Sequence, residues 1–379
     1  MSITAHLPRY PLAFLPTPLQ PLPRLSKLLA SNLQPPASTF QLLIKRDDQT
    51  GLATGGNKTR KLEFLVADAL ALGCDTLITV GATQSNHCRQ TAAAAARAGL
   101  KCHLVLGGEP PAQANGNLLL DVLFGAELHW TPRENRLNRL AELTDELRTA
   151  GCRPYPITYG GSDPVGACGY AAALEELHEQ VADLGLQVDA IVIPSSSSGT
   201  HAGLVAGAWA LGGDAPIVGV SIDELQADLQ AKVADLATAT ATRLGRPHTF
   251  AADDITVDAG YLGDGYGVVG DLEREAISLM ARTEGILLDP VYTGRAFGGL
   301  LDMLQRPEGF RKPFGSHARN IVFWHTGGTP ALFAYASELT SLGRFQAILN
   351  AGRREIRETG GIAHEEFWQQ VEAETPSAG

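Results

Sequence analysis

A lysine stands two residues after a glycine pair and begins an apolar, helix-like run in the segment Gly55-Gly56-Asn57-Lys58. Burial at such a position disfavours the charged form of the amine and lowers its pKa. A lysine that loses its proton easily attacks carbonyl carbons and forms Schiff bases. We therefore expect Lys58 to bond covalently to an aldehyde cofactor, with pyridoxal phosphate (PLP) as the leading hypothesis. By itself, the segment fits equally well a loop that turns into a helix with a solvated basic first turn.

A run of small residues, 194–203, stands between a predicted strand and a predicted helix. Small residues let the backbone wrap closely around a ligand, and a helix N-terminus adds N–H donors and the positive end of its dipole. Four consecutive serines, 195–198, exceed what a helix cap needs, so we expect this loop to bind phosphate. The loop lacks the Gly-Lys-Ser/Thr of a nucleotide P-loop and does not imply ATP. The structural alternative is a polar loop that only caps the helix.

Two further segments place polar side chains after predicted strands. Ser85 suits the N-cap of a helix whose N–H groups could receive a substrate carboxylate, and Asn86 could hydrogen-bond a phenolic oxygen. Tyr292 can act as an acid or a base, and Thr293 offers a neutral hydroxyl to a ring nitrogen. The local sequence leaves a purely structural role open for each of these residues.

A rival interpretation comes from Gly265, Gly267 and Gly270, which form a literal G-x-G-x-x-G. A strand-like run (255–258) precedes them and a helical run (271–283) follows, as in a dinucleotide-binding fingerprint. However, the loop 259–264 replaces the tight turn that the fingerprint needs, and Tyr266 puts a bulky ring beside the supposed pyrophosphate. We keep an NAD-binding dehydrogenase as the alternative from a different class.

The composition excludes several classes of protein. The chain has 379 residues with 44% hydrophobic and 19% charged residues, which describes a globular protein large enough for two domains. Its net charge of −11 argues against nucleic acid as a partner, and no apolar run has the length of a membrane span. We see no signal peptide, and the five cysteines form no C-x-x-C pair, so reduced thiols in the cytoplasm are expected. The histidines show no metal-binding spacing, so no metal is expected.

Strand and helix patterns alternate along the chain, which predicts an α/β protein with doubly wound sheets and helices on both faces. The predicted helices are 58–72, 85–98, 118–124, 139–149 and 201–210. The predicted strands are 41–46, 76–80, 101–106, 189–193, 217–221, 285–288 and 320–323. Residues 372–379 are expected to form a frayed tail.

Four motifs follow one another in a family order: GGNKTRKLEF at 55–64, QSNHCRQTAA at 84–93, SGTHAGL at 198–204 and EGILLDPVYTGRA at 284–296. Over almost its whole length the chain resembles the fold-type II PLP enzymes, which share the tryptophan-synthase β-subunit fold. Within them it is similar to the D-cysteine desulfhydrase and 1-aminocyclopropane-1-carboxylate (ACC) deaminase family. The resemblance implies two open-sheet domains with the cofactor in the cleft between them. We place the large domain at 1–57 and 170–379 and the small domain at 58–169.

The resemblance also implies roles for individual residues. Lys58 would carry PLP, and the phosphate would be held by Lys61 and by the backbone of Ser197, Ser198, Gly199 and Thr200. Asn86 would contact the phenolic oxygen of the cofactor. The substrate carboxylate would be bound by Ser85 and Asn86, with Gln84 as a further candidate. Tyr266 and Tyr292 would flank the reacting carbon, with Ser85 also counted in the catalytic set.

Thr293 distinguishes two activities of this family. By the resemblance, ACC deaminases carry a glutamate directly after the tyrosine that corresponds to Tyr292, and this glutamate faces the pyridine nitrogen. A carboxylate keeps that nitrogen protonated and makes the ring a strong electron sink, whereas a hydroxyl can donate to the unprotonated nitrogen. Ring opening needs the stronger sink, so Thr293 favours β-elimination, and His87 is expected on the same side.

The predicted reaction is therefore a β-elimination on a small amino acid, with D-cysteine as the first choice and pyruvate, ammonia and hydrogen sulfide as products. ACC deaminase and L-cysteate sulfo-lyase are the alternatives within the family. A homodimer is expected from the resemblance only.

Overall fold

The computed structural model describes residues 2–32, 40–305 and 319–340. Residues 1–334 form one compact unit, and residues 335–379 form a second unit, of which 335–340 are described and include α13 (Ala336–Leu339). The predicted tail at 372–379 lies outside the described residues. No helix in the described part of the chain has the length and apolar character needed to cross a membrane.

The larger sheet has six strands within the described residues, in the order β1 (Leu19–Pro21), β2 (Gln41–Arg46), β10 (Asn320–His325), β7 (Ala190–Ser195), β8 (Ile217–Ser221) and β9 (Thr256–Asp258). All neighbouring strands are parallel except β1, which is antiparallel to β2. The inner strands are buried along their length, as expected of parallel strands covered on both faces.

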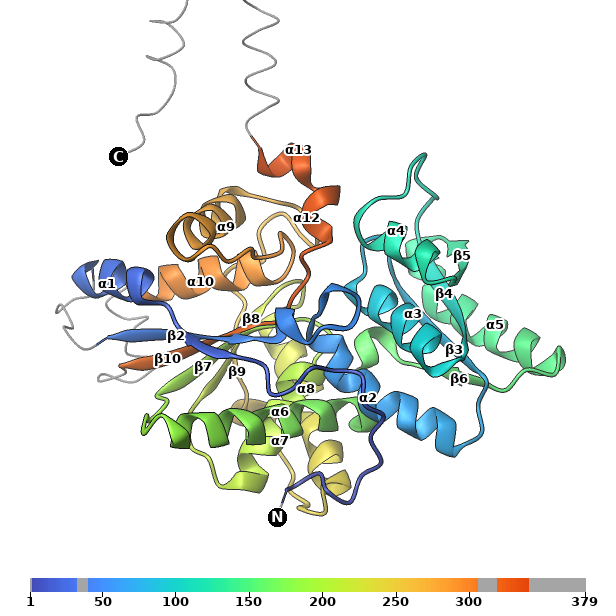
Figure 1. Ribbon diagram of the computed structural model, residues 1–379, viewed down its shortest axis with the longest axis horizontal. Helices are drawn as coiled ribbons and strands as arrows, with labels where there is room; N and C mark the ends of the chain where they lie inside the picture. Colours follow the sequence, from blue (N-terminus) through green and yellow to red (C-terminus); the bar gives the residue numbers. More distant parts are fainter. Residues whose placement is uncertain (1, 33–39, 306–318, 341–379) are drawn as a thin grey trace, which may run out of the picture. The chain divides into compact units, whose positions relative to one another are not determined.

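Helices cover both faces of this sheet (Figure 1). One face packs against α6 (Pro164–Asp183) and α7 (Gly199–Leu211), with α8 (Gln226–Arg243) beside them. The other face carries α1 (Pro23–Asn32) and α10 (Thr293–Gln305), and α9 (Asp271–Glu284) packs against α10. The sheet is therefore doubly wound, as predicted.

The smaller sheet has four parallel strands within the described residues, in the order β5 (Glu127–Thr131), β4 (Lys101–Gly107), β3 (Thr76–Ala82) and β6 (Pro154–Pro156). On one face Leu77 and Leu104 pack against α2 (Asn57–Ala71), α3 (Asn86–Ala98) and α4 (Gly116–Leu123). On the other face Val80 and Val105 pack against α5 (Arg136–Thr149). α12 (Ala331–Ala334) contacts α4.

The α/β prediction is confirmed, including the parallel pairing of 76–80 with 101–106 through an intervening helix. The strand predicted at 285–288 is wrong. Gly285 ends α9 in the left-handed conformation (φ 68°), and the apolar residues after it lead into the turn before α10 without pairing with a strand. They are apolar because Ile286 and Leu288 pack inward from a connection between two helices.

The strands of the smaller sheet lie between residues 76 and 156, and those of the larger sheet lie at 19–46 and 190–325. Both sets fall inside the domains predicted from the sequence. The domain boundaries at 57–58 and 169–170 stay a prediction.

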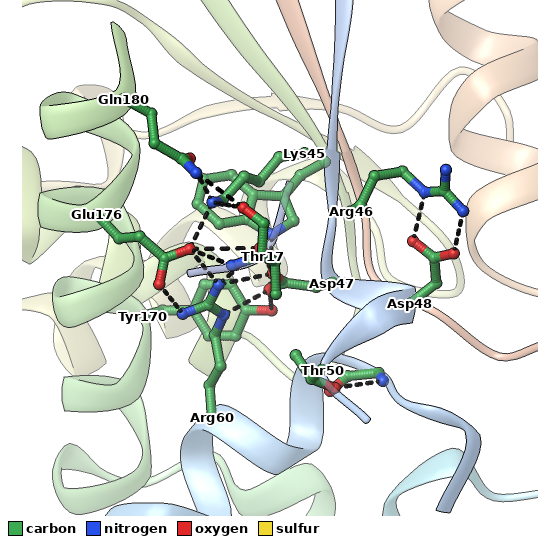
Figure 2. Close-up of polar contacts among 12 residues, drawn as sticks. Thr17, Lys45, Arg46, Asp47, Asp48, Thr50, Arg60, Tyr170, Glu176 and Gln180 are labelled. Carbon is green, nitrogen blue, oxygen red and sulfur yellow. Dashed lines mark hydrogen bonds and ion pairs between the residues drawn. The ribbon is translucent and has the colours of Figure 1, made fainter. Parts of the chain in front are cut away.

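A buried ionic network joins β2, α2 and α6 (Figure 2). Asp47, directly after β2, accepts hydrogen bonds from Arg60 Nε and Nη2 at 2.9 Å and from the Tyr170 hydroxyl at 2.6 Å. Glu176 on α6 accepts from Arg60 Nη1 at 3.0 Å and forms an ion pair with Lys45. Arg60 is 1% exposed and Asp47 is fully buried, so each charge depends on the other.

The pKa values show that the pairing outweighs burial. Burial alone would raise the pKa of Asp47, but the Arg60 guanidinium holds it below its ordinary value. Burial would likewise lower the pKa of Arg60, yet Asp47 and Glu176 raise it above its ordinary value. Both groups therefore stay ionised, and the network fixes α2 against the larger sheet.

We predict that Asp47→Ala lowers the free energy of unfolding by about 3–5 kcal/mol, because it leaves the Arg60 guanidinium buried with one carboxylate fewer. Urea-induced unfolding measures the change. Glu109→Ala, at an exposed position, is the matched control and should stay within about 0.5 kcal/mol of the parent protein. Equal stability of the two variants would contradict the role given to this network.

Candidate active site

One pocket collects residues from the carboxyl ends of strands in both sheets. Seven of the site residues predicted from the sequence line it: Lys58, Ser85, Asn86, Ser197, Ser198, Thr200 and Tyr292. Five others are not among the lining residues: Lys61, Gln84, Gly199, Tyr266 and Thr293. Because the carboxyl ends of parallel strands are where α/β folds bind ligands, this pocket is the candidate site.

Two lysines from the start of α2 converge on one carbonyl oxygen. Lys58 Nζ lies 3.3 Å and Lys61 Nζ 3.2 Å from the oxygen of Gly160. Burial lowers the pKa of Lys58 to about 8. Burial, together with the charge of Lys58, holds the pKa of Lys61 well below its ordinary value. In the described part of the chain no carboxylate forms an ion pair with either amine, so the pair is arranged to receive an anion.

The serine loop supplies donors for such an anion. Ser198 holds the N-cap position of α7 with a left-handed φ of 67°, but its side chain makes no capping hydrogen bond. The Gly199 N–H instead donates to Ser162 Oγ at 3.2 Å. A Cβ on Gly199 would lie 2.7 Å from Lys61 Nζ, so the Lys61 amine sits directly against the loop backbone. Asn57 Nδ2 donates to Thr200 Oγ1 at 3.0 Å and ties α2 to the loop. These contacts place the Lys61 amine at the N-terminus of α7, where the helix dipole also favours a negative charge.

A strained turn sets the position of Lys58. Gly55 and Gly56 have φ of 73° and 128°, and a Cβ on Gly55 would lie 1.9 Å from the Asp48 carbonyl oxygen. Arg89, fully buried on α3, donates to Gly55 O at 2.8 Å and to Thr54 Oγ1 at 2.7 Å. The glycines are required by sterics here, and Arg89 holds the turn from the side of the smaller sheet.

The start of α3 presents donors to the pocket. Ser85 Oγ accepts from Cys88 N at 3.1 Å, as the predicted N-cap, which leaves its own hydrogen available to a ligand. Asn117 Nδ2 donates to Asn86 Oδ1 at 2.9 Å, which leaves the Asn86 amide group as a donor. Gln84 instead uses its side chain to hold Asn115 and Asn117. Its predicted contact with the substrate stays a prediction.

The hydroxyl of Tyr292, which lines the pocket, meets that of Tyr266, which does not. Tyr266 Oη and Tyr292 Oη are 2.6 Å apart, with their rings edge to face. Burial is the main cause that holds the pKa of Tyr292 well above its ordinary value, and the neighbouring Tyr266 raises it further. The Tyr292 hydroxyl therefore stays protonated. Thr293, next to it, is fully buried and exchanges hydrogen bonds with Asp289 through its hydroxyl at 2.7 Å. The predicted role of Thr293 toward a ring nitrogen is not tested by these contacts.

His87 also lines the pocket, as a neutral ring. Burial is the main cause that holds the pKa of His87 well below its ordinary value, and the charges of Lys58 and Lys61 lower it further. Its Nε2 lies 2.9 Å from Thr79 Oγ1, and its buried Nδ1 has no hydrogen-bond partner among the described residues.

Sequence reasoning missed Tyr159 and Gly160, which line the pocket. In the chain these two residues lie between α5 and α6. The run Tyr159-Gly160-Gly161-Ser162 follows the short strand β6, and its paired glycines were the available signal. Gly160 has φ 69°, and its carbonyl receives both lysine amines.

The loop that carries the rival fingerprint surrounds a cation instead of an anion. Carbonyl oxygens of Leu262, Gly265 and Val268 accept hydrogen bonds from the buried Arg295 guanidinium at 2.8–3.1 Å. A pyrophosphate would need N–H donors at this point. The loop instead places Tyr266 against Tyr292.

Comparison with known proteins identifies relatives over most of the chain. The sequence profile of a family described as "Pyridoxal-phosphate dependent enzyme" matches residues 11–327. A D-cysteine desulfhydrase of Klebsiella pneumoniae is 44% identical over 340 residues, which cover 88% of this chain and 98% of that protein. A D-cysteine desulfhydrase of Salmonella choleraesuis is 43% identical, covering 87% and 98%.

Solved structures show the same fold. A crystal structure of an ACC deaminase homologue superposes with a TM-score of 0.79 at 36% identity, covering 90% of this chain and 98% of that one. Cysteine synthase of Entamoeba histolytica superposes with a TM-score of 0.60 at 16% identity, covering 86% and 88%, which supports the fold alone. The fold-type II architecture expected from the resemblance is confirmed.

We predict that Lys58 of the cofactor-free protein is unusually reactive near neutral pH. Only the neutral amine is acylated. A pKa of about 8 makes half of Lys58 neutral at pH 8, whereas solvated lysines, with a pKa near 10.4, are almost entirely protonated at that pH. Acetic anhydride labelling at pH 6–11 with peptide mass spectrometry should give a midpoint for Lys58 about two pH units below that of a lysine in a short model peptide. Coincident profiles for Lys58 and the model peptide would show that burial does not activate Lys58.

A second prediction concerns the turn before Lys58. Gly55→Ala forces the backbone away from the Asp48 carbonyl, so we expect the affinity for PLP to fall at least about tenfold. Titration of the cofactor-free variant, followed by visible absorbance, measures this affinity. Gly213→Ala is the matched control, because a Cβ there meets no atom closer than 3.8 Å. Unchanged affinity in Gly55→Ala would mean that the turn does not position Lys58.

Proposed function

Since this chain belongs to the family of pyridoxal-phosphate-dependent enzymes, we propose that it catalyses β-elimination from D-cysteine. One water is consumed, and hydrogen sulfide, pyruvate and ammonia are released. The observation that carries the proposal is the 43–44% identity to two D-cysteine desulfhydrases over 98% of their length. Because nearly the whole length of those proteins is matched, their whole catalytic unit has a counterpart here.

The pocket fits PLP. Its phosphate would bind at the N-terminus of α7, with the Lys61 ammonium and the backbone of Ser197, Ser198, Gly199 and Thr200 as partners. The amine of Lys58 would bind the aldehyde carbon, and the Asn86 amide would donate to the phenolic oxygen. When bound, the cofactor supplies an electron sink for the carbanion at the α-carbon of the substrate.

The substrate carboxylate would lie at the N-terminus of α3. The Ser85 hydroxyl and the Asn86 amide have free hydrogens there, because Cys88 N and Asn117 occupy their acceptor oxygens. The helix dipole adds to the attraction of this end for a negative charge. These donors would fix the α-carbon next to Lys58, so that only its proton and the β-substituent face reactive groups.

Proton transfers are assigned to groups with opposite pKa shifts. The Lys58 amine, whose pKa burial lowers to about 8, would remove the α-proton as a general base. The C–S bond then breaks and its electron pair leaves with sulfur. The Tyr292 hydroxyl, kept protonated by burial and joined to Tyr266, would donate the proton that turns the thiolate into a thiol. Hydrolysis of the remaining three-carbon unit gives pyruvate and ammonia.

ACC deamination is the second candidate, because the ACC deaminase homologue is 36% identical to this chain. Two features favour D-cysteine over it. The position after Tyr292 carries the neutral Thr293 instead of a carboxylate, and the nearby carboxylate of Asp289 is occupied by Thr293 and by backbone N–H groups. A sink of moderate strength suffices to expel a thiol.

The assembly and location expected from the resemblance are part of the proposal. We place the enzyme in the cytoplasm as a homodimer, and all five cysteines are free thiols, which agrees with a reducing compartment. Sedimentation velocity of the purified enzyme tests the dimer.

We predict that Lys58→Ala loses the visible absorbance of bound PLP and lowers turnover of D-cysteine by about 10²–10⁴-fold or more. Lys101→Ala, far from the pocket in sequence and exposed, is the control and should keep both properties. Ammonia release, which is common to all three reactions, is measured with D-cysteine, L-cysteate and ACC as separate substrates, and sulfide release is measured in addition with D-cysteine. Faster turnover of ACC or L-cysteate than of D-cysteine would overturn the substrate, and an active Lys58→Ala enzyme would overturn the mechanism.

A further inference from the structure

Three side chains that can bind a metal meet on the smaller sheet, near the amino ends of its strands and outside the PLP pocket. His103 lies on β4, and Glu127 and His129 lie on the edge strand β5. In the register of these strands His103 pairs with Glu127 and Val105 pairs with His129. Since side chains alternate between faces, all three project from the face that α5 covers. The sequence shows no metal spacing because strand register, not a local motif, brings them together.

The donor atoms have the spacing of ligands around one ion. His103 Nδ1 is 3.1 Å from His129 Nε2. The Glu127 carboxylate oxygens lie 3.6 Å from His103 Nδ1 and 3.5 Å from His129 Nε2. Ligands bound tetrahedrally to zinc at 2.0–2.1 Å are about 3.3–3.4 Å apart. The triangle of donors therefore needs only a few tenths of an ångström of adjustment to enclose an ion.

The surroundings favour a cation at this point. His103 is buried and His129 is half-buried, and the neutral imidazole is the form of histidine that binds metals. The positive charge of Arg139, on α5, is already paired with Glu146 at 2.6 Å and with Glu142 at 3.4 Å. The Glu127 side chain is 66% exposed, so an ion has a route from solvent and the carboxylate can close over it.

We propose that His103, Glu127 and His129 bind one Zn²⁺ ion, with water as the fourth ligand. Two imidazoles and a carboxylate are a ligand set that zinc accepts, with a tetrahedral position left for water. The hydrogen that now lies between the two imidazoles would move to the outer nitrogen of its ring, so no net proton is lost. The ion would join the edge strand β5 to β4 and stabilise the smaller sheet.

The test uses the full-length enzyme with PLP bound, freed of metal by a chelator and then dialysed. Equilibrium dialysis against Zn²⁺ should show that the parent enzyme binds one zinc per chain. His129→Ala and His129→Gln should each bind zinc at least about tenfold more weakly, since loss of a direct ligand costs no less than loss of a supporting group. Glu127→Gln should weaken binding in the same direction. His178→Ala, which removes an exposed histidine on α6, is the matched control and should bind zinc as the parent does.

Thermal unfolding gives an independent readout, because an ion that binds only the folded state raises the midpoint temperature. Zinc should raise it in the parent and in His178→Ala, but not in the His129 variants. His129→Gln keeps a side chain of similar size, so it distinguishes lost coordination from lost packing. Absence of zinc uptake by the parent, or uptake that is equal in the parent and in both His129 variants, would overturn the proposal. Activity toward D-cysteine does not enter this test, so it stands or falls separately from the proposed reaction.

Discussion

The position of Lys58 depends on a buried ion pair two residues further along the same helix. Arg60 is enclosed by protein, and its carboxylate partners come from other elements, Asp47 after β2 and Glu176 on α6. A buried guanidinium without partners is strongly unfavourable, so α2 packs where both carboxylates meet Arg60. That placement determines where the Lys58 amine emerges relative to the larger sheet and the serine loop.

The same helix holds two cations with the opposite electrostatic condition. Arg60 is compensated on every side, whereas Lys58 and Lys61 share one neutral carbonyl, that of Gly160. Their lowered pKa values express the free energy that burial costs an ammonium group without a counter-charge. A phosphate beside them would remove much of this cost, so the destabilised pair amounts to a preference for an anionic ligand. Compensated and uncompensated cations thus separate the structural part of α2 from its functional part.

Local patterns predicted much of the fold because they are determined by near neighbours in the chain. The strand at 41–46 and the helix after Ser85 were predicted closely, since β-rich composition and an N-cap serine act within a few residues. The segment 285–288 has the same apolar composition but no strand partner, and it became a connection between helices. An apolar run reports burial, and only the surroundings decide whether that burial is in a sheet.

Residue types in the sequence were enough to predict candidate site residues: an amine after two glycines, a serine loop before a helix, and a tyrosine followed by a threonine. The sequence did not predict which of these side chains lie close together in space. The Gly160 carbonyl between two lysines, the Arg89 contact that holds the turn at Gly55, and the pairing of Tyr266 with Tyr292 each join segments far apart in sequence. Such contacts form only when the helices and strands pack together. A hydrogen bond depends on the distance and direction between its two atoms, and the sequence does not determine these until the two sheets have formed.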